Sequence, residues 1–383
     1  MRTFFRKLGQ IGWSFPVIAA LVALCLGGIL VIGIATSTND TLKDASASQF
    51  KYMLVGFVFY VGIALVPYRF LVRISPILYL IGILFLVGVY IPGMRHKVFG
   101  AYSWLRLGPL SFEPSEYAKL ASILFLAWFL RLREKQVNYF STVAIAIVIM
   151  FIPFLLIKEQ PALGSASVFI PICICMLFAA GVRWYYIALP LALVASFTVI
   201  AYYWIHVWDK PVPFLKDYQL FRAKVFFDPD LDPKGAGWQI DQSMTAIGSG
   251  GLNGKGASAV SLTSLGYLPK NTSYNDLIFA VVGELFGFRG GAALIICEGT
   301  VLLWCLWVAA RARDKIGAMV AVGVMAMLFT HIFVNIGMTI QVVPITGIPL
   351  PFISYGGTFL VACLAAMGLV QSVWVHRKNF ERI

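Results

Sequence analysis

Ten apolar runs, most of them long enough to cross a lipid bilayer, constrain this chain more than any other feature. A membrane-spanning α-helix takes about 20 mostly apolar residues. With 60% hydrophobic and 12% charged residues, the chain has too little polar surface for a water-soluble globule. We therefore expect an all-α polytopic membrane protein with about ten transmembrane helices. The runs comprise residues 15–36, 52–67, 76–92, 116–131, 141–157, 165–181, 184–205, 288–310, 316–342 and 356–375.

A long polar segment, residues 206–275, separates the seventh apolar run from the eighth. Loops of more than about 12–15 residues are usually functional or disordered. Asp228–Pro233 resembles the start of a calcium loop but has proline where glycine is needed, so Asp-Pro turns explain it better. Gly248–Gly256 departs from the phosphate-loop pattern, which excludes a nucleotide site; it is either a backbone cradle for another anion or a flexible loop. No separate soluble domain is expected, and residues 1–383 form a single transmembrane domain that includes the long loop.

Positive charge predicts how the chain is oriented in the membrane. If the N-terminus is cytoplasmic, half of the Lys and Arg residues fall in cytoplasmic segments, and most acidic residues lie elsewhere. Both termini are then cytoplasmic and the loop 206–275 is extracytoplasmic. The net charge of +13 accordingly reflects topology and contact with anionic phospholipids, not nucleic-acid binding. The basic start Arg2–Lys7 resembles a signal peptide, but the apolar run behind it is too long, so we expect an uncleaved first helix.

Residues 344–357 place three prolines and three glycines between two long apolar runs. A helix cannot continue through this composition, because proline removes a backbone donor and clashes with the preceding turn. At membrane depth, irregular backbone persists where it is buried in protein or lines a wet cavity. The segment is either an ordinary tight turn or the border of a polar cavity. We favour the cavity, because a two-residue turn would have been enough to connect the helices.

A few polar side chains lie where charge is costly. Glu116 and Lys119 begin the fourth run three residues apart and can pair on one helix face. Taken alone, a capped helix start with a self-satisfied ion pair is the favoured explanation. Asp276 lies where the long loop meets the membrane, and carboxylates in apolar stretches are functional candidates by default. His331 is expected to form a helix–helix hydrogen bond. Glu298 has no assignable partner in the sequence.

Several motifs are spread over nearly the whole chain. They are Trp104 to Glu116 with Lys119, Gln160-Pro161 with Leu163-Gly164, Arg222 with Phe227–Gly256, Leu268-Pro269 with Asp276–Ala280, Asn335–Met338, and Pro344–Gly357. This set resembles the SEDS family (shape, elongation, division and sporulation), which are polytopic glycosyltransferases that polymerise peptidoglycan from lipid II. Within the family, Ile345–Pro349 is most similar to the branch that serves cell elongation.

The resemblance implies a substrate and a reaction. Asp276 would act on lipid II as the catalytic group, either as a general base or as the ligand of a divalent cation, Mg²⁺ or Mn²⁺. A positioned carboxylate can take the proton of a sugar hydroxyl, which is otherwise a poor nucleophile at neutral pH. A single displacement at the anomeric carbon gives an inverted, β-1,4 linkage, and cations stabilise the departing undecaprenyl pyrophosphate. No nucleotide cofactor is expected. The resemblance also assigns substrate binding to Trp104, Glu116, Lys119, Arg222, Lys224, Gln242, Ser243, Lys255, Ser354, Gly356 and Gly357.

The chain departs from the family pattern at five positions. Three of these departures remove acids, because Ala162 replaces an aspartate, Lys270 a glutamate and Leu285 the second glutamate of a pair. The other two lie in the first motif, where Ser103 replaces an arginine and Glu113 a glutamine. Asp276 is thus the one acid that matches a family motif where the loop meets the membrane.

Two other functional classes stay open. A transporter (flippase) of lipid-linked precursors would also use ten spans and a cavity, although Asp276 lies near the surface and not at the membrane midplane. An inactive scaffold for a transpeptidase would explain the missing acids. The resemblance implies a bacterial inner-membrane location, a class B penicillin-binding protein as partner, and further membrane proteins of the elongation complex.

Overall fold

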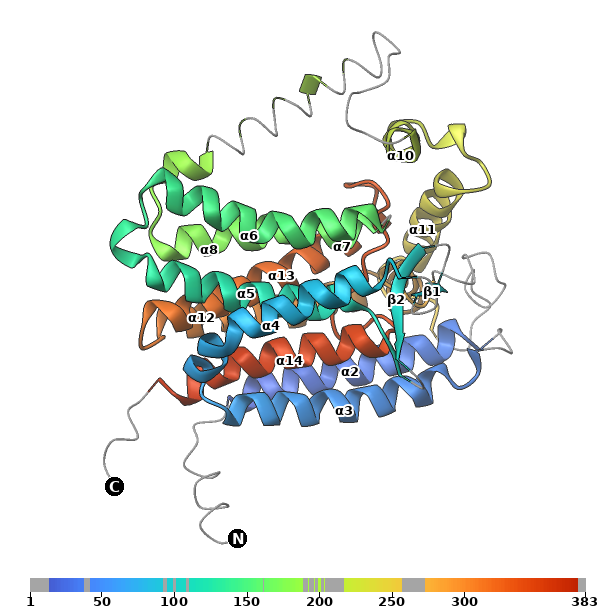
Figure 1. The fold of residues 1–383 in the computed structure, drawn as a ribbon. Helices are drawn as coiled ribbons and strands as arrows, with labels where there is room; N and C mark the ends of the chain where they lie inside the picture. The colour runs from blue at the N-terminus through green and yellow to red at the C-terminus, as the bar shows by residue number, and fades with distance from the viewer. Residues whose placement is uncertain are drawn as a thin grey trace, which may run out of the picture.

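The computed structural model contains a bundle of long helices with a small sheet at one end (Figure 1). It describes residues 14–37, 42–91, 95–98, 101–107, 110–160, 162–188, 217–256 and 273–377, with a few single residues between 192 and 203. The predicted run 184–205 and parts of the long loop therefore lie largely outside the described residues.

Nine of the ten predicted spans correspond to helices in the described part of the chain. Eight helical segments are long and apolar enough to cross a membrane, and α5, with Glu116, Lys119 and Arg131, is the more polar ninth. This confirms a polytopic, all-helical membrane protein. The helices are α2 (Phe15–Ala35), α3 (Ala45–Leu65), α4 (Tyr68–Gly88), α5 (Pro114–Leu132), α6 (Phe140–Glu159), α7 (Leu163–Ser167) with α8 (Phe169–Ala180), α12 (Ile278–Ala310), α13 (Lys315–Thr339) and α14 (Gly357–Val375).

Three helices begin well before their apolar runs. α12 begins at Ile278 and not at residue 288, with a kink at Gly287, and two others begin about two turns early. α3 begins at Ala45 and not at residue 52, and α4 begins at Tyr68 and not at residue 76. Pro76, where the predicted run begins, lies inside α4. Proline leaves one carbonyl of the preceding turn without its helical donor. The Ser75 hydroxyl satisfies it by donating to the Val72 carbonyl at 2.7 Å, so the helix continues.

A three-stranded antiparallel sheet joins α4 to α5. Its strands are β1 (Arg95–Val98), β2 (Ala101–Leu107) and β3 (Leu110–Phe112), in the order β1-β2-β3. Trp104 lies opposite His96 in the β1–β2 pair. The sequence patterns did not predict these strands, which are too short for a recognisable alternation. The sheet delivers the chain to the start of α5 at the same end of the bundle as α11 (Figure 1).

The described part of the long loop is helical. It contains α10 (Asp217–Phe227), a 3₁₀ turn η3 (Pro229–Leu231) and α11 (Ala236–Gly250). Asp232 accepts a hydrogen bond from the Ala236 amide at 2.8 Å and so stabilises the start of α11, as expected of an Asp-Pro turn.

The glycine-rich stretch after α11 packs on α12. The amides of Lys255 and Gly256 donate to the carbonyls of Glu284 and Leu285, each at 3.0 Å. Gly254 has a φ of 78° and faces the Leu285 carbonyl so closely that a side chain would not fit. The predicted alternatives were an anion cradle and a flexible loop, but these two amides are instead used to attach the stretch to α12.

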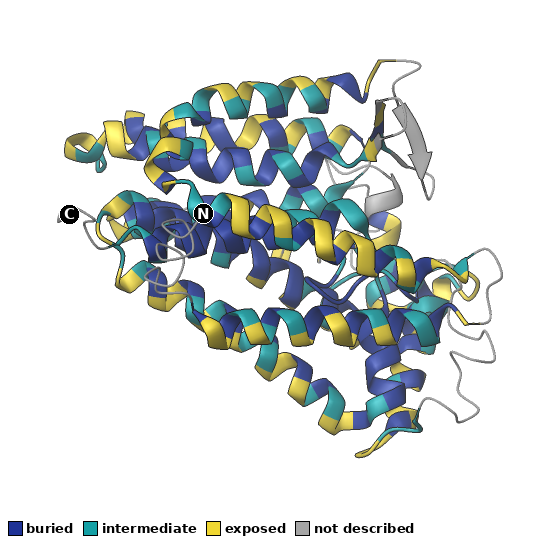
Figure 2. Ribbon diagram, turned by 90° about the horizontal axis from the view of Figure 1, so that it is seen from below, coloured by how far each residue is buried: buried dark blue, intermediate teal, exposed yellow. Residues whose placement is uncertain are grey.

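α14 is the most buried of the long helices, and α5 and α13 are also largely buried. Buried residues gather on the helix faces that point into the bundle (Figure 2). α14 packs closely against α3 because a glycine stands at the contact, an arrangement common among membrane helices. A Cβ on Gly368 would lie 2.7 Å from the carbonyl oxygen of Tyr60 in α3, so a side chain there would force the backbones apart. The Ser14 hydroxyl donates to Gln371 at 2.5 Å, which ties the start of α2 to the end of α14.

We expect Gly368→Val to destabilise the protein, because the Tyr60 backbone cannot move aside. Overpacking typically costs about 1–3 kcal/mol, and thermal unfolding in detergent measures it as a lowered Tm. Gly299→Val is the matched control, since no atom lies within 4 Å of a Cβ at that position in α12. Equal Tm values for the two variants would contradict the close α3–α14 packing.

Candidate active site

A polar cavity of about 240 Å³ lies at the end of the bundle that carries the sheet, α10 and α11. Parts of the chain that are far apart in sequence build its wall: β2, the start of α5, α7, α10, the residues before α12, and the segment 344–357. The lining residues are Ser103, Trp104, Glu113, Glu116, Ala162, Gly164, Ser165, Arg222, Asn275, Asp276, Thr346, Gly347, Pro349, Tyr355, Gly356 and Phe359.

Asp276 lines this wall, and one of its carboxylate oxygens is buried without a hydrogen-bond partner in the described part of the chain. Its backbone carbonyl accepts a hydrogen bond from the Asn335 amide at 2.9 Å, and the same amide donates to the Ile348 carbonyl at 2.7 Å. Gly347, with a φ of 71°, passes beside the carboxylate, so that a Cβ there would lie 3.3 Å from Oδ2. Oδ1 has no hydrogen-bond partner among the described residues. Burial raises the pKa of Asp276 to about 6, although the Arg222 guanidinium acts in the opposite direction.

The segment 344–357 borders the cavity, as predicted from its prolines and glycines. Its backbone is satisfied by side chains from elsewhere. The Ser354 hydroxyl accepts from the Leu350 amide at 2.7 Å and donates to the Asn275 carbonyl at 2.6 Å. Gln49 of α3 donates to the Ser354 carbonyl at 3.0 Å and accepts from the Gly356 amide at 3.2 Å. These bonds fix the segment against the residues that precede α12.

Glu116 and Lys119 form the predicted pair, and it is buried. Lys119 Nζ lies 2.8 Å from Glu116 Oε1, and the lysine side chain is fully buried. The same Nζ lies 3.0 Å from Nε2 of His331 in α13, whose Nδ1 lies 3.2 Å from the Pro349 carbonyl. With Lys119 as donor to Nε2, the histidine carries its proton on Nδ1 and donates to Pro349. The predicted helix–helix bond of His331 therefore also connects the ion pair to the segment 344–357.

Glu113 places a second carboxyl group in the wall of the cavity. The Ser115 hydroxyl donates to Glu113 Oε1 at 2.7 Å. Burial, followed by the charge of Glu116, raises the pKa of Glu113 to about 7. The sequence marked this residue only as a departure from a motif, and its place beside a cavity could not be seen from spacing.

The structure brings some of the predicted site residues to the cavity. Trp104, Glu116, Arg222, Asp276 and Gly356 line it. Sequence reasoning did not assign a role to the polar lining residues Ser103, Ser165 and Thr346, which lie in or beside the recognised motifs.

The other predicted binding residues lie outside the cavity wall. Ser354 holds backbone within the segment 344–357, and Gly357 packs closely against the ring of Tyr52. Lys255 Nζ lies 3.1 Å from Glu284 Oε1, so this lysine pairs with α12. Lys119 is fully buried and pairs with Glu116, which lines the cavity. The remaining members, on α10 and α11, are Lys224, Gln242 and Ser243.

The divalent-cation prediction stays untested. Within the described ranges, no group of three or more His, Cys, Asp or Glu side chains is placed to hold a metal ion. We therefore derive no step through a metal.

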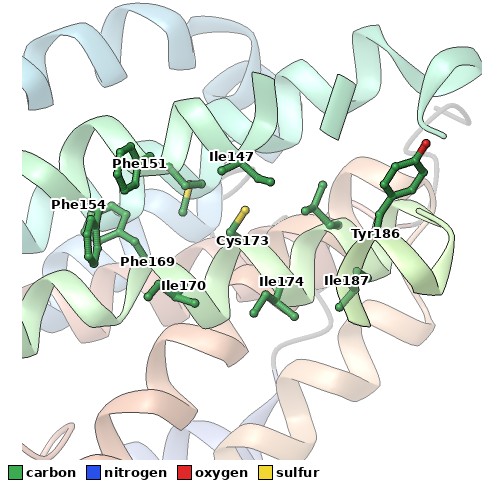
Figure 3. A pocket seen from close by; sticks show the side chains of 11 residues that line it. Ile147, Phe151, Phe154, Phe169, Ile170, Cys173, Ile174, Tyr186 and Ile187 are labelled. Carbon is green, nitrogen blue, oxygen red and sulfur yellow. The ribbon is translucent and has the colours of Figure 1, made fainter. Parts of the chain in front are cut away.

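A second hollow lies between α6 and α8 and has different chemistry. Figure 3 shows its apolar side chains, among them Phe151, Phe154, Phe169 and Ile174, with Cys173 between them. It shares no residue with the polar cavity and offers no acid–base group beyond Cys173 and Tyr186. The polar cavity is therefore the candidate active site.

Comparison with known proteins decides the family. The family model described as cell cycle protein (FtsW/RodA/SpoVE) matches residues 13–379. The chain belongs to this family. It is 37% identical over 362 residues to peptidoglycan glycosyltransferase MrdB of Escherichia coli K12, a match that covers 94% of this chain and 93% of the relative. It is 36% identical over 368 residues to stage V sporulation protein E of Bacillus subtilis, covering 93% and 95%.

Solved structures of the family have the same fold. One chain of a peptidoglycan synthase complex that coordinates polymerization and crosslinking superposes with a TM-score of 0.77 at 26% identity, covering 97% of this chain and 100% of that one. The rod shape determining protein RodA of Thermus thermophilus superposes with a TM-score of 0.68 at 23% identity, covering 97% and 99%.

We expect Lys119→Met to lower the free energy of unfolding by about 3–5 kcal/mol, because it leaves Glu116 charged and unpaired in the interior. Chemical unfolding in detergent measures this loss. Arg131→Met is the matched control: Arg131 and Glu134 are also three residues apart, but their side chains are 53% and 33% exposed. Such surface pairs contribute about 0–1 kcal/mol. Similar losses in both variants would show that burial of the Lys119 pair has no energetic consequence.

Proposed function

We propose that this protein is a peptidoglycan glycosyltransferase that polymerises lipid II into β-1,4 glycan strands during cell elongation and releases undecaprenyl pyrophosphate. The observation that carries the proposal is the unpaired carboxylate of Asp276 in a polar cavity at the end of a membrane bundle. The similarity to MrdB, a named peptidoglycan glycosyltransferase, supports it.

Asp276 would serve as the general base. A carboxyl with a pKa of about 6 is ionised at neutral pH, yet it is more basic than an ordinary aspartate. It takes the proton of the acceptor's sugar hydroxyl while that oxygen attacks the donor's anomeric carbon. The bond from this carbon to the diphosphate oxygen breaks in the same displacement, so the configuration inverts.

Arg222 would stabilise the leaving group. It lines the cavity from α10, and its guanidinium is exposed and holds the Ile345 carbonyl only at 3.4 Å. It can therefore turn toward an anion at little cost. A diphosphate gains negative charge as it departs, and a positioned cation favours that transition state. The apolar helix surfaces around the bundle would accommodate the undecaprenyl tail within the bilayer.

The alternative roles have less support. A flippase would be expected to bind its cargo near the membrane midplane, whereas the cavity lies at the end of the bundle. An inactive scaffold would have no need of an unpaired carboxylate, and Asp276 has one. Ordinary helix capping does not explain Asp276 either, since α12 begins after Leu277 without a side-chain cap.

We further propose that the cavity faces the extracytoplasmic side, that both termini are cytoplasmic, and that a class B penicillin-binding protein is the partner. The distribution of Lys and Arg supports the orientation. The likeness to one chain of a peptidoglycan synthase complex supports the partner.

We expect Asp276→Asn to lower the rate of glycan synthesis from lipid II by about 10²–10⁴-fold, because asparagine cannot accept the proton. Gel analysis of glycan products made by the purified protein, with and without the partner, measures this. The matched control is Asp232→Asn, which keeps an acceptor for the Ala236 amide at a residue that does not line the cavity, and is expected to stay active. Near-normal synthesis by Asp276→Asn would refute the assignment.

The orientation has its own test. We expect a membrane-impermeant thiol reagent to label Leu252→Cys in intact cells, but to label Gln136→Cys only after lysis, because these exposed residues lie beyond opposite ends of the bundle. The six native cysteines are buried or partly buried and give the background. The reverse labelling pattern would place the cavity in the cytoplasm.

A further inference from the structure

We propose that Glu113 binds the diphosphate of the substrate as a neutral hydrogen-bond donor, so that its ionisation weakens substrate binding. This inference rests on the proposed function, since it concerns the same cavity. It assigns a binding role to a residue that lines the same cavity as Asp276.

The local geometry leaves one oxygen of Glu113 for a ligand. The residue stands at the N-cap of α5, but its side chain makes no capping hydrogen bond to the helix. The Ser115 hydroxyl occupies Oε1 as a donor at 2.7 Å. A protonated Glu113 therefore carries its hydrogen on Oε2, the oxygen for which the described residues provide no bond.

The charges around the cavity favour a neutral Glu113. The negative charge of Glu116 on α5 is neutralised by Lys119, whose Nζ lies 2.8 Å away. The same lysine donates a hydrogen bond to His331 on α13. Among the described lining residues, Arg222 of α10 then faces two carboxyl groups, those of Glu113 and Asp276. Tyr355 contributes a phenol that is neutral at physiological pH. If both carboxyls were ionised, the wall would be net negative and would repel a diphosphate.

The acidities separate the two carboxyls. Burial, the charge of Glu116 and, to a smaller extent, the charge of Asp276 raise the pKa of Glu113 to about 7. The pKa of Asp276 is about 6. The negative charges of Glu116 and Asp276 favour the protonated form of Glu113, whereas Arg222 favours the ionised form of Asp276, which is the division of roles that a donor and a base require. A bound diphosphate adds negative charge nearby and favours the protonated form of Glu113 further.

The consequence is a pH dependence with a definite sign. Glu113 is protonated below its pKa of about 7 and loses its donor as the pH rises through that value. The KM for lipid II then increases by up to about tenfold for each further pH unit. Glutamine has nearly the same shape and offers an N–H donor that cannot ionise.

The experiment measures kcat and KM for lipid II from acidic to alkaline pH in wild type, Glu113→Gln and Glu113→Leu. We expect the alkaline increase in KM to be present in wild type and absent in Glu113→Gln, whose KM is then the lower one above about pH 8. Glu113→Leu has no donor, so its KM is raised even at acidic pH. Glu134→Gln, at an exposed ion pair far from the cavity, retains the wild-type alkaline limb.

The outcomes separate the two proposals. An alkaline increase in KM that persists in Glu113→Gln overturns the role of Glu113, whether or not Glu113→Leu folds. A wild-type protein that makes no glycan from lipid II, with or without the partner, overturns the proposed function itself. If the alkaline pH dependence appears in kcat but not in KM, Glu113 does not act in substrate binding, and the inference is contradicted.

Discussion

Backbone that leaves a helix near the membrane must still satisfy its amides and carbonyls, and this requirement shapes the whole site. The segment 344–357 finds its partners in side chains of other helices: Gln49 of α3 and Asn335 of α13, with Ser354 supplying an internal bond. In hydrocarbon each unsatisfied group would cost several kcal/mol. The hydrogen bonds that stabilise the non-helical segment 344–357 also hold Gly347 beside Asp276.

Asn335 connects the fold to the chemistry. Its side-chain amide donates to the carbonyls of Asp276 and Ile348, so the base and the irregular segment are held by the same group. One turn earlier on the same helix, His331 bonds the Pro349 carbonyl and the buried Lys119. The ion pair is thus bonded, through His331, to the segment that borders the cavity.

The sequence predicted the membrane bundle, the border of the cavity and the Glu116–Lys119 pair, because each rests on local rules. Apolar length, proline and glycine composition, and three-residue spacing can all be read along the chain. The tertiary placement could not be read in this way. Lys255 was assigned to the substrate by its motif, yet it pairs with Glu284 because close glycine contacts attach its loop to α12.

Glu113 is the opposite case, a residue that the fold places in the cavity wall although sequence reasoning assigned it no role. Its motif position gave no role, since only the fold shows that it and Asp276 share one cavity. α4 begins before its apolar run. Inside the helix, Ser75 satisfies the carbonyl that Pro76 leaves without a donor.

The most direct test of the account is a structure of the Asp276→Asn variant with lipid II bound, which would trap the substrate before transfer. The account predicts that the acceptor's attacking hydroxyl lies within about 3 Å of the position-276 side chain, with the donor's diphosphate beside Arg222 and Glu113. Sugar density bound elsewhere, for example in the hollow between α6 and α8 with the polar cavity empty, would contradict it.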